Sequence, residues 1–118
     1  MLSRALVVAI ALVAFAAQAQ AGDARSEAKE QVEFGIKVAQ NGLWKEAAYR
    51  WQKAVELDPT YAAAWNNLGY WYLETRRFAE AEQHFKKAIA LDSTNSRHWD
   101  NLGKVYLNTG RYAEAEQH

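Results

Sequence analysis

The chain has 118 residues, half of them apolar, and its 14 basic residues are balanced by 14 acidic ones. This length suffices for one small domain, and the composition is globular rather than disordered. The neutral charge balance gives no case for nucleic-acid binding, which needs a basic face. Because the chain has no cysteine, disulfide scaffolds, thiolate zinc sites and cysteine nucleophiles are excluded.

The N-terminal segment, residues 1–21, has the three parts of a secretory signal peptide. Arg4 precedes an unbroken apolar run over residues 5–17, and small residues then alternate up to Ala21. The apolar run is shorter than the ~20 residues that cross a bilayer comfortably. We therefore predict cleavage after Ala19 or Ala21, export to a periplasm or the cell envelope as a secreted protein, and no stable membrane span in the mature chain. An uncleaved anchor is the alternative.

A polar lead-in over residues 22–27 follows the predicted signal peptide. The first helix is expected to begin between Asp23 and Ala28, because Asp23 or Ser26 can accept hydrogen bonds from the free amides at a helix start. Asn-Gly at residues 41–42 indicates a turn, and a second helix is predicted over residues 44–57.

The segment 65–88 predicts two short amphipathic helices that are broken near residues 75–77, since apolar residues recur at steps of three and four on each side. The same pattern returns 34 positions later. Its first half matches at Trp65 and Trp99, Asn67 and Asn101, Leu68 and Leu102, Gly69 and Gly103, and Tyr72 and Tyr106, and residues 77–84 match residues 111–118 at all but one position.

The 34-residue unit, with Trp, Leu-Gly, Tyr, Ala, a large aromatic residue, Ala and Pro at set places, resembles the tetratricopeptide repeat. The resemblance covers residues 28–118, as repeats 28–61, 62–95 and a truncated third repeat 96–118. It implies an all-α fold, an antiparallel helix-pair solenoid of about two and a half repeats that follows the signal peptide.

Stacking follows from physics as well, because one helix pair cannot enclose its own apolar face. Glycine and alanine are expected where two helices cross closely, and aromatic side chains fill the wider gaps beside them. The expected packing residues are Gly35, Ala47, Trp51, Trp65, Leu68, Gly69, Tyr72, Ala81, Phe85, Ala88, Trp99, Leu102, Gly103, Tyr106 and Ala115.

Three features of the chain depart from the repeat pattern. Gln31 replaces the tryptophan of the later units, which suits the exposed end of a solenoid. Arg76 stands where the flanking units have Gly42 and Gly110. The third unit stops before the counterparts of Phe85 and Ala88, so the chain is expected either to be a piece of a longer array or to cover its open end with a partner or a second copy, as a homo-oligomer.

No catalytic or metal site is predicted. His84 and His118 share a repeat position and therefore lie about one helix-packing distance apart, roughly 9–10 Å, which is too far for one zinc ion. These histidines and His98 are expected to face solvent. Glu80 and Glu82 are two residues apart and straddle a helix instead of converging. We therefore expect no enzyme, no metal and no cofactor.

In the family that the chain resembles, the first helix of each pair lines a concave surface that binds partners. The resemblance places there Lys29, Val32 and Ile36 from the first unit, Asn66, Tyr70 and Leu73 from the second, and Arg97, Asp100 and Lys104 from the third. Such a mixed surface suits an extended or helical peptide with one apolar anchor and a polar or acidic segment. The alternative is an ordinary surface on a spacer.

Chaperone-binding members of the family hold a C-terminal carboxylate with lysine, asparagine and arginine side chains from three units. The matching positions here are Val32, Ile36, Asn67, Arg97 and Asn101, of which only Asn67 and Arg97 fit. Such a clamp is therefore not expected.

The sequence favours a non-catalytic scaffold for protein–protein contact, with a peptide or protein as partner. Two alternatives of other classes stay open. The chain is either the N-terminal repeat portion of a larger exported enzyme or envelope assembly factor, or a self-associating structural protein.

Overall fold

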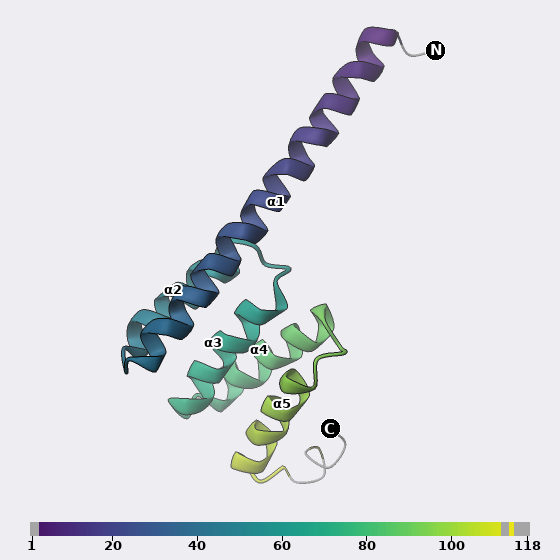
Figure 1. The fold of residues 1–118 in the computed structure, drawn as a ribbon. Coiled ribbons are helices and arrows are strands. Elements are labelled where there is room, and N and C mark those ends of the chain that lie inside the picture. The colour runs from purple at the N-terminus through teal and green to yellow at the C-terminus, as the bar shows by residue number, and fades with distance from the viewer. Residues whose placement is uncertain (1–2, 112–113, 115–118) are drawn as a thin grey trace.

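The computed structural model describes residues 3–111 and residue 114, with all of their side chains except those of residues 6, 9–11 and 14–19. The described residues form helices joined by short turns, and no strand occurs among them. The helices are α1 (Arg4–Gln40), α2 (Trp44–Leu57), α3 (Ala62–Glu74), α4 (Phe78–Leu91) and α5 (Ser96–Asn108) (Figure 1).

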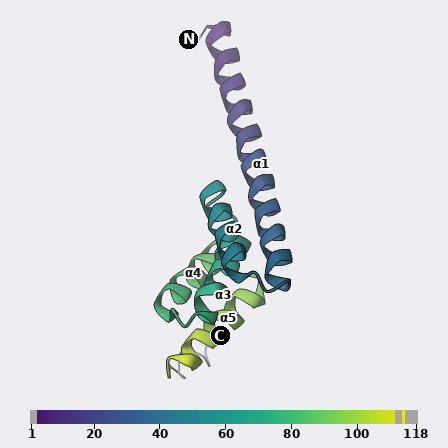
Figure 2. The same ribbon diagram turned by 90° about the vertical axis from the view of Figure 1, so that its left-hand side faces the viewer.

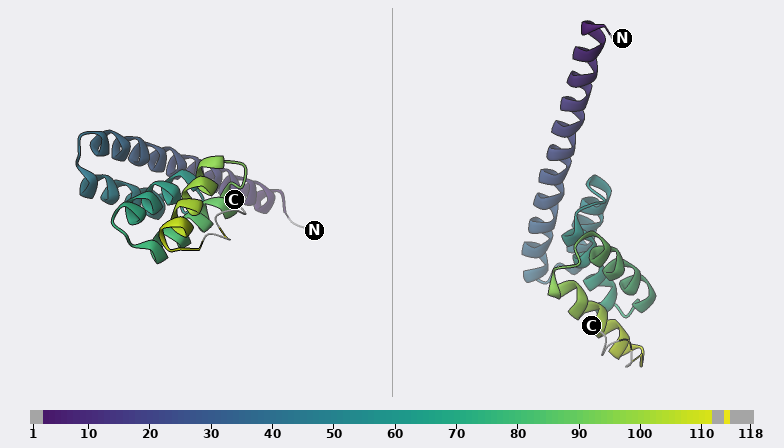
Figure 3. Two further views of the ribbon diagram at one scale, coloured as in Figure 1. Left: turned by 90° about the horizontal axis from the view of Figure 1, so that it is seen from below. Right: turned by 90° about the vertical axis from the view of Figure 1, so that its right-hand side faces the viewer.

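Successive helices pack as antiparallel pairs, which confirms the predicted solenoid. α1 lies against α2 and α3 against α4, while α2 contacts α3 and α4 contacts α5 to join the units. Figure 2 and Figure 3 show the pairs following one another in a row, with α5 at the far end from α1. The predicted turn at residues 41–42, the predicted break near residues 75–77 and the predicted helix over residues 44–57 are all confirmed.

α1 is much longer than expected, and its N-terminal half extends beyond the other helices (Figure 1). The prediction that a helix begins between Asp23 and Ala28 is wrong, because α1 already begins at Arg4 and runs through both the apolar run and the polar lead-in. Alanine-rich sequence favours helix, and no proline interrupts it. Among the described residues, no helix is long and apolar enough to cross a membrane. Cleavage of residues 1–21 stays a prediction.

The 34-residue period reappears in the turns. The indole of Trp65 donates to the Pro59 carbonyl at 2.8 Å, and the indole of Trp99 donates to the Ser93 carbonyl at 2.9 Å. In the same turns, one carboxylate oxygen of Asp58 accepts from the Thr60 hydroxyl, and Asp92 repeats this with Thr94. The units are therefore alike in hydrogen bonding as well as in helix placement.

Two glycines are sites of close approach between paired helices. A Cβ on Gly35 would lie 2.5 Å from the Trp51 ring, and a Cβ on Gly69 would lie 2.7 Å from the Phe85 ring. Ala47 and Ala81 beside them are fully buried, as predicted. The same Cβ on Gly103 would meet nothing within 4 Å, so the close crossing predicted there is not found in the described chain. Ala115, which was predicted to pack at the same helix crossing, lies outside the described residues.

The first unit replaces an aromatic contact with a polar one. In the second unit, His84 packs on Trp65 at 5.3 Å and on Tyr72 at 4.8 Å between ring centroids. Arg50 and Gln31 occupy the corresponding positions, and the Arg50 guanidinium reaches the Gln31 side-chain oxygen at 3.4 Å. This exchange agrees with a polar end to the solenoid.

We predict opposite effects for alanine at two equivalent glycines. Gly69→Ala should lower the free energy of unfolding by about 1–3 kcal/mol, because the Phe85 ring must move aside. Gly103→Ala should leave it unchanged or raise it by up to about 1 kcal/mol, because no described atom lies within 4 Å of the added methyl group and alanine favours helix. Urea denaturation followed by circular dichroism measures both, and equal destabilisation would contradict the assigned crossing.

The turns give a second matched pair of variants. Arg76 adopts a left-handed backbone with φ 63°, like Gly42 at φ 82°. Arg76→Gly should therefore raise the free energy of unfolding by about 1 kcal/mol, and Gly42→Ala should lower it by about as much. No atom lies within 4 Å of a Cβ on Gly42, so backbone strain alone acts in the control. Thermal and urea unfolding test the pair, and a loss of stability in Arg76→Gly would show that its stacking on Phe78 matters more.

Candidate functional site

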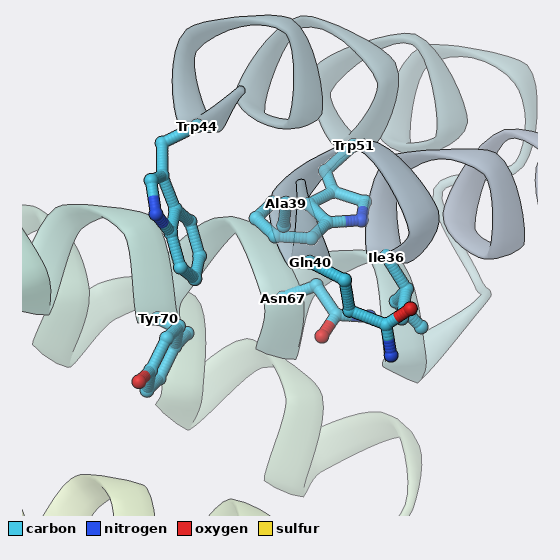
Figure 4. Close-up of a pocket in the computed structure, with 7 residues that line it drawn as sticks. All are labelled: Ile36, Ala39, Gln40, Trp44, Trp51, Asn67 and Tyr70. Carbon is cyan, nitrogen blue, oxygen red and sulfur yellow. The ribbon is translucent and has the colours of Figure 1, made fainter. Parts of the chain in front are cut away.

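Two neighbouring hollows lie along α1, α3 and α5, the first helices of the three units. The apolar hollow has a volume of about 260 Å³ and is lined by Ile36, Ala39, Gln40, Trp44, Trp51, Asn67 and Tyr70 (Figure 4). The cationic hollow has a volume of about 340 Å³ and is lined by Asn66, Asn67, Tyr70, Arg97, Asn101 and Lys104. Both share Asn67 and Tyr70 of α3, and we call the continuous surface of the two hollows the groove.

The apolar hollow is built from three helices. Trp51 is only 2% exposed, and its indole donates to the Val32 carbonyl at 3.3 Å, which fixes one wall of the hollow. Trp44 and Tyr70 approach from α2 and α3, with ring centroids 6.1 Å apart. Figure 4 shows these two rings beside each other at one edge, with Trp51 behind. Trp44 and Ile36 are each 39% exposed, so the hollow offers apolar surface to solvent.

The size and lining of the apolar hollow favour a side chain as its occupant. Pockets for drug-sized ligands usually measure about 300–1,000 Å³, and this one is smaller. Tyr70 is the one ionisable residue among the described residues that line it, and burial together with the nearby Glu74 carboxylate raises the pKa of the Tyr70 hydroxyl. The phenol therefore stays neutral at physiological pH, and the hollow carries no charge.

The cationic hollow has a polar floor and charged walls. The Asn101 amide donates to the Asn66 oxygen at 3.0 Å, a buried bond that links α5 to α3. The side-chain N–H groups of Asn66 take no part in this bond. Arg97 and Lys104 stand on α5 and are exposed, and neither forms an ion pair with another described residue. No described residue that lines this hollow is acidic.

The groove contains five of the nine predicted partner-binding residues: Ile36, Asn66, Tyr70, Arg97 and Lys104. Two of the predicted residues need correction. Val32 and Leu73 are 3% and 8% exposed, belong to the core and line neither hollow. Lys29 and Asp100 are exposed but line neither hollow.

Sequence reasoning missed Trp44 as a groove residue. It begins α2 directly after the turn, and a tryptophan at a helix start reads as ordinary core. The repeat pattern gave no signal of its exposure, because the corresponding residues Phe78 and Tyr112 are also large and aromatic. A second helix that begins with an aromatic residue therefore need not bury it.

A third hollow lies at the opposite ends of the helices. It measures about 310 Å³ and is lined by both turns between units and by His98. The prediction that His98 faces solvent is wrong, since it is 2% exposed and neither ring nitrogen has a hydrogen-bond partner among the described residues. Its counterpart in the second unit is the fully buried Ala64. His84 is also half-buried, packed on Trp65 and Tyr72.

None of the described residues that line the groove is a histidine, carboxylate, serine or threonine. Within residues 3–111 and 114, no three potential metal ligands converge.

Comparison with family models finds three matches. A tetratricopeptide repeat model matches residues 62–95, a TPR repeat model matches residues 38–75, and a further tetratricopeptide repeat model matches residues 84–117. A search of curated proteins found no match.

Several solved structures are similar in fold. The second TPR of Spaghetti (RPAP3) bound to the HSP90 peptide SRMEEVD has a TM-score of 0.77 and 24% identity, covering 85% of this chain and 91% of that one. The Arabidopsis OM64 TPR domain has a TM-score of 0.75 and 24% identity, covering 80% and 78%. MamA has a TM-score of 0.70 and 27% identity, covering 76% of this chain and 53% of that chain.

The buried His98 predicts a loss of stability in mild acid. Burial lowers the pKa of His98 from its usual 6.5, and Arg97 adds to this while Asp92 opposes it. Above pH 6.5 the ring is neutral in both states, but below it the unfolded chain takes up a proton before the folded one does. Stability should therefore fall as pH drops from 6.5 through the lowered value.

The variant His98→Ala copies Ala64 of the second unit. It should reduce the difference in free energy of unfolding between pH 7.5 and pH 5.5, measured by urea denaturation at each pH. His84 shifts in the same direction and remains in the variant, so some dependence should persist. An unchanged difference would mean that the buried ring is protonated as easily as in the unfolded chain.

Proposed function

The chain belongs to the tetratricopeptide repeat family, and we propose that it is a non-catalytic scaffold that binds a peptide or protein partner in its groove. Repeats of this family typically mediate protein–protein interaction. The finer assignment, that this groove is the binding surface, rests on one observation. Four helices, α1, α2, α3 and α5, bring exposed apolar side chains and cations that pair with no described acidic residue onto one continuous surface.

Exposure supports the proposal. Trp44 and Ile36 would normally be buried, yet each remains 39% exposed beside a hollow that solvent must fill. Binding a partner side chain there would remove this apolar surface from water, a gain of about 25 cal/mol per Å². Aromatic anchors in pockets of this kind often carry most of the binding energy of an interface.

The similar structures support peptide binding as the mode of contact. The first and second TPRs of RPAP3 are each described with a bound HSP90 peptide. The present groove differs from the expected chaperone clamp, because Val32 is buried and Ile36 lines the apolar hollow. We therefore propose peptide capture without a C-terminal carboxylate clamp.

We further propose that the scaffold is exported. The apolar run that follows Arg4 and the small residues before Ala21 support removal of a signal peptide, and the described part of the repeat domain begins its packed core only at Ala28. Mass spectrometry of protein from the periplasm should find a mature chain that begins at Gln20 or Gly22. A chain that still begins at Met1 would contradict the cleavage.

Binding to the groove should depend on Trp44 and Tyr70. Peptides selected from a random 12-residue library displayed on phage are labelled, and their affinity is measured by fluorescence anisotropy. Trp44→Ala with Tyr70→Ala should weaken binding at least 10-fold, because the apolar hollow loses the two rings at its edge. Tyr49→Ala is the matched control, since Tyr49 is an exposed aromatic residue of the same helix as Trp44 and lies outside the groove.

The control variant should bind as the natural protein does, and circular dichroism should show equal helix content in all three. If no library peptide binds, or if the double variant binds as well as the natural chain, the groove is not the binding surface.

A further inference from the structure

We propose that the groove reads an internal, extended segment of its partner in which a large apolar side chain and a carboxylate side chain lie two residues apart. The apolar side chain occupies the hollow between α1, α2 and α3, and the carboxylate occupies the hollow between α3 and α5. This inference rests on the proposed function and names the chemistry of the partner.

The two hollows are adjacent, which fixes how close the two partner side chains must be. Asn67 and Tyr70 line both of them, so a ligand crosses α3 in passing from one to the other. In an extended chain, residues i and i+2 point to the same side and are separated by about 6–7 Å. One residue then lies above α3 between the two seated side chains.

The residue above α3 can be held through its backbone. The Asn67 side chain carries both a donor and an acceptor, and it is half-buried at the boundary of the two hollows. A side-chain amide can pair with the N–H and C=O groups of an extended peptide. This contact would fix the segment without regard to the identity of its central residue.

The acidic preference follows from charge. Arg97 and Lys104 of α5 line the cationic hollow together with Asn66, whose side-chain oxygen accepts from Asn101. Guanidinium and ammonium groups bind carboxylates through charge-assisted hydrogen bonds. Two acidic residues close in sequence, Asp100 and Glu74, line neither hollow. Asp100 is four residues from Lys104 and makes no ion pair with it, and Glu74 is directed to the Tyr70 hydroxyl.

The segment should be internal because the described lining of the groove has no second group of cations to hold a terminal carboxylate as well. Ile36 lines the apolar hollow, and Val32 is buried, so the α1 side of the groove offers no cation. The cations are confined to the α5 side. One carboxylate, supplied by an aspartate or glutamate side chain, satisfies them.

Synthetic peptides test this directly. Each is 12 residues long, acetylated and amidated so that it has no terminal carboxylate, and built on a serine and threonine background. One set carries leucine, phenylalanine or tryptophan with glutamate two residues away, in either order. Matched peptides replace the glutamate by glutamine, replace the apolar residue by alanine, or move the glutamate to one or four residues away.

The paired peptides with two-residue spacing should bind at least 10-fold tighter than the glutamine, alanine or respaced versions. Lys104→Glu should remove the preference for glutamate over glutamine, and a peptide with lysine in place of glutamate should regain affinity for this variant. Lys53→Glu, an exposed cation outside the groove, is the matched control and should change nothing. Raising the salt concentration should weaken the glutamate peptide more than the glutamine peptide.

The outcomes separate the inference from the proposed function. If library peptides bind in a manner that depends on Trp44 but the glutamate peptides gain nothing over glutamine, the inference is overturned and the scaffold stands. The inference is likewise overturned if binding requires a free C-terminal carboxylate. If neither the library peptides nor the synthetic peptides bind, both the proposed function and the inference are contradicted.

Discussion

The structure depends on the contact between a glycine of the first helix in a unit and an aromatic ring of the second. Gly35 admits the Trp51 ring and Gly69 admits the Phe85 ring, at distances that leave no room for a methyl group. The alanines Ala47, Ala54, Ala81 and Ala88 are fully buried beside these rings. Close packing of this kind sets the separation of the paired helices, and the hollows of the groove follow from it.

Stacking such pairs places the first helices of successive units side by side, and a binding surface results without any dedicated loop. The groove takes its apolar character from the first two units and its charge from the third. α3 is the helix common to both, which explains why Asn67 and Tyr70 border each hollow. A surface that spans units can therefore change its chemistry by exchanging residues in one unit alone.

The repeat made the fold predictable, because a fixed period gives the helix pairs, their turns and most packing residues at once. The repeat could not predict how far each side chain is buried, because equivalent positions have different neighbours. Val32 and Leu73 occupy positions expected on the surface but are buried, and Trp44 begins a helix yet stays exposed. The long α1 was missed because a polar segment was taken as a helix boundary, although no residue in it breaks a helix.

The bond between Asn66 and Asn101 joins the last described helix to the unit before it. A ligand that touches α3 and α5 together favours the docked position of α5, and by reciprocal linkage the docked helix favours the ligand. Occupancy of the groove and the docking of α5 are therefore linked, and hydrogen exchange in α5 reports on both.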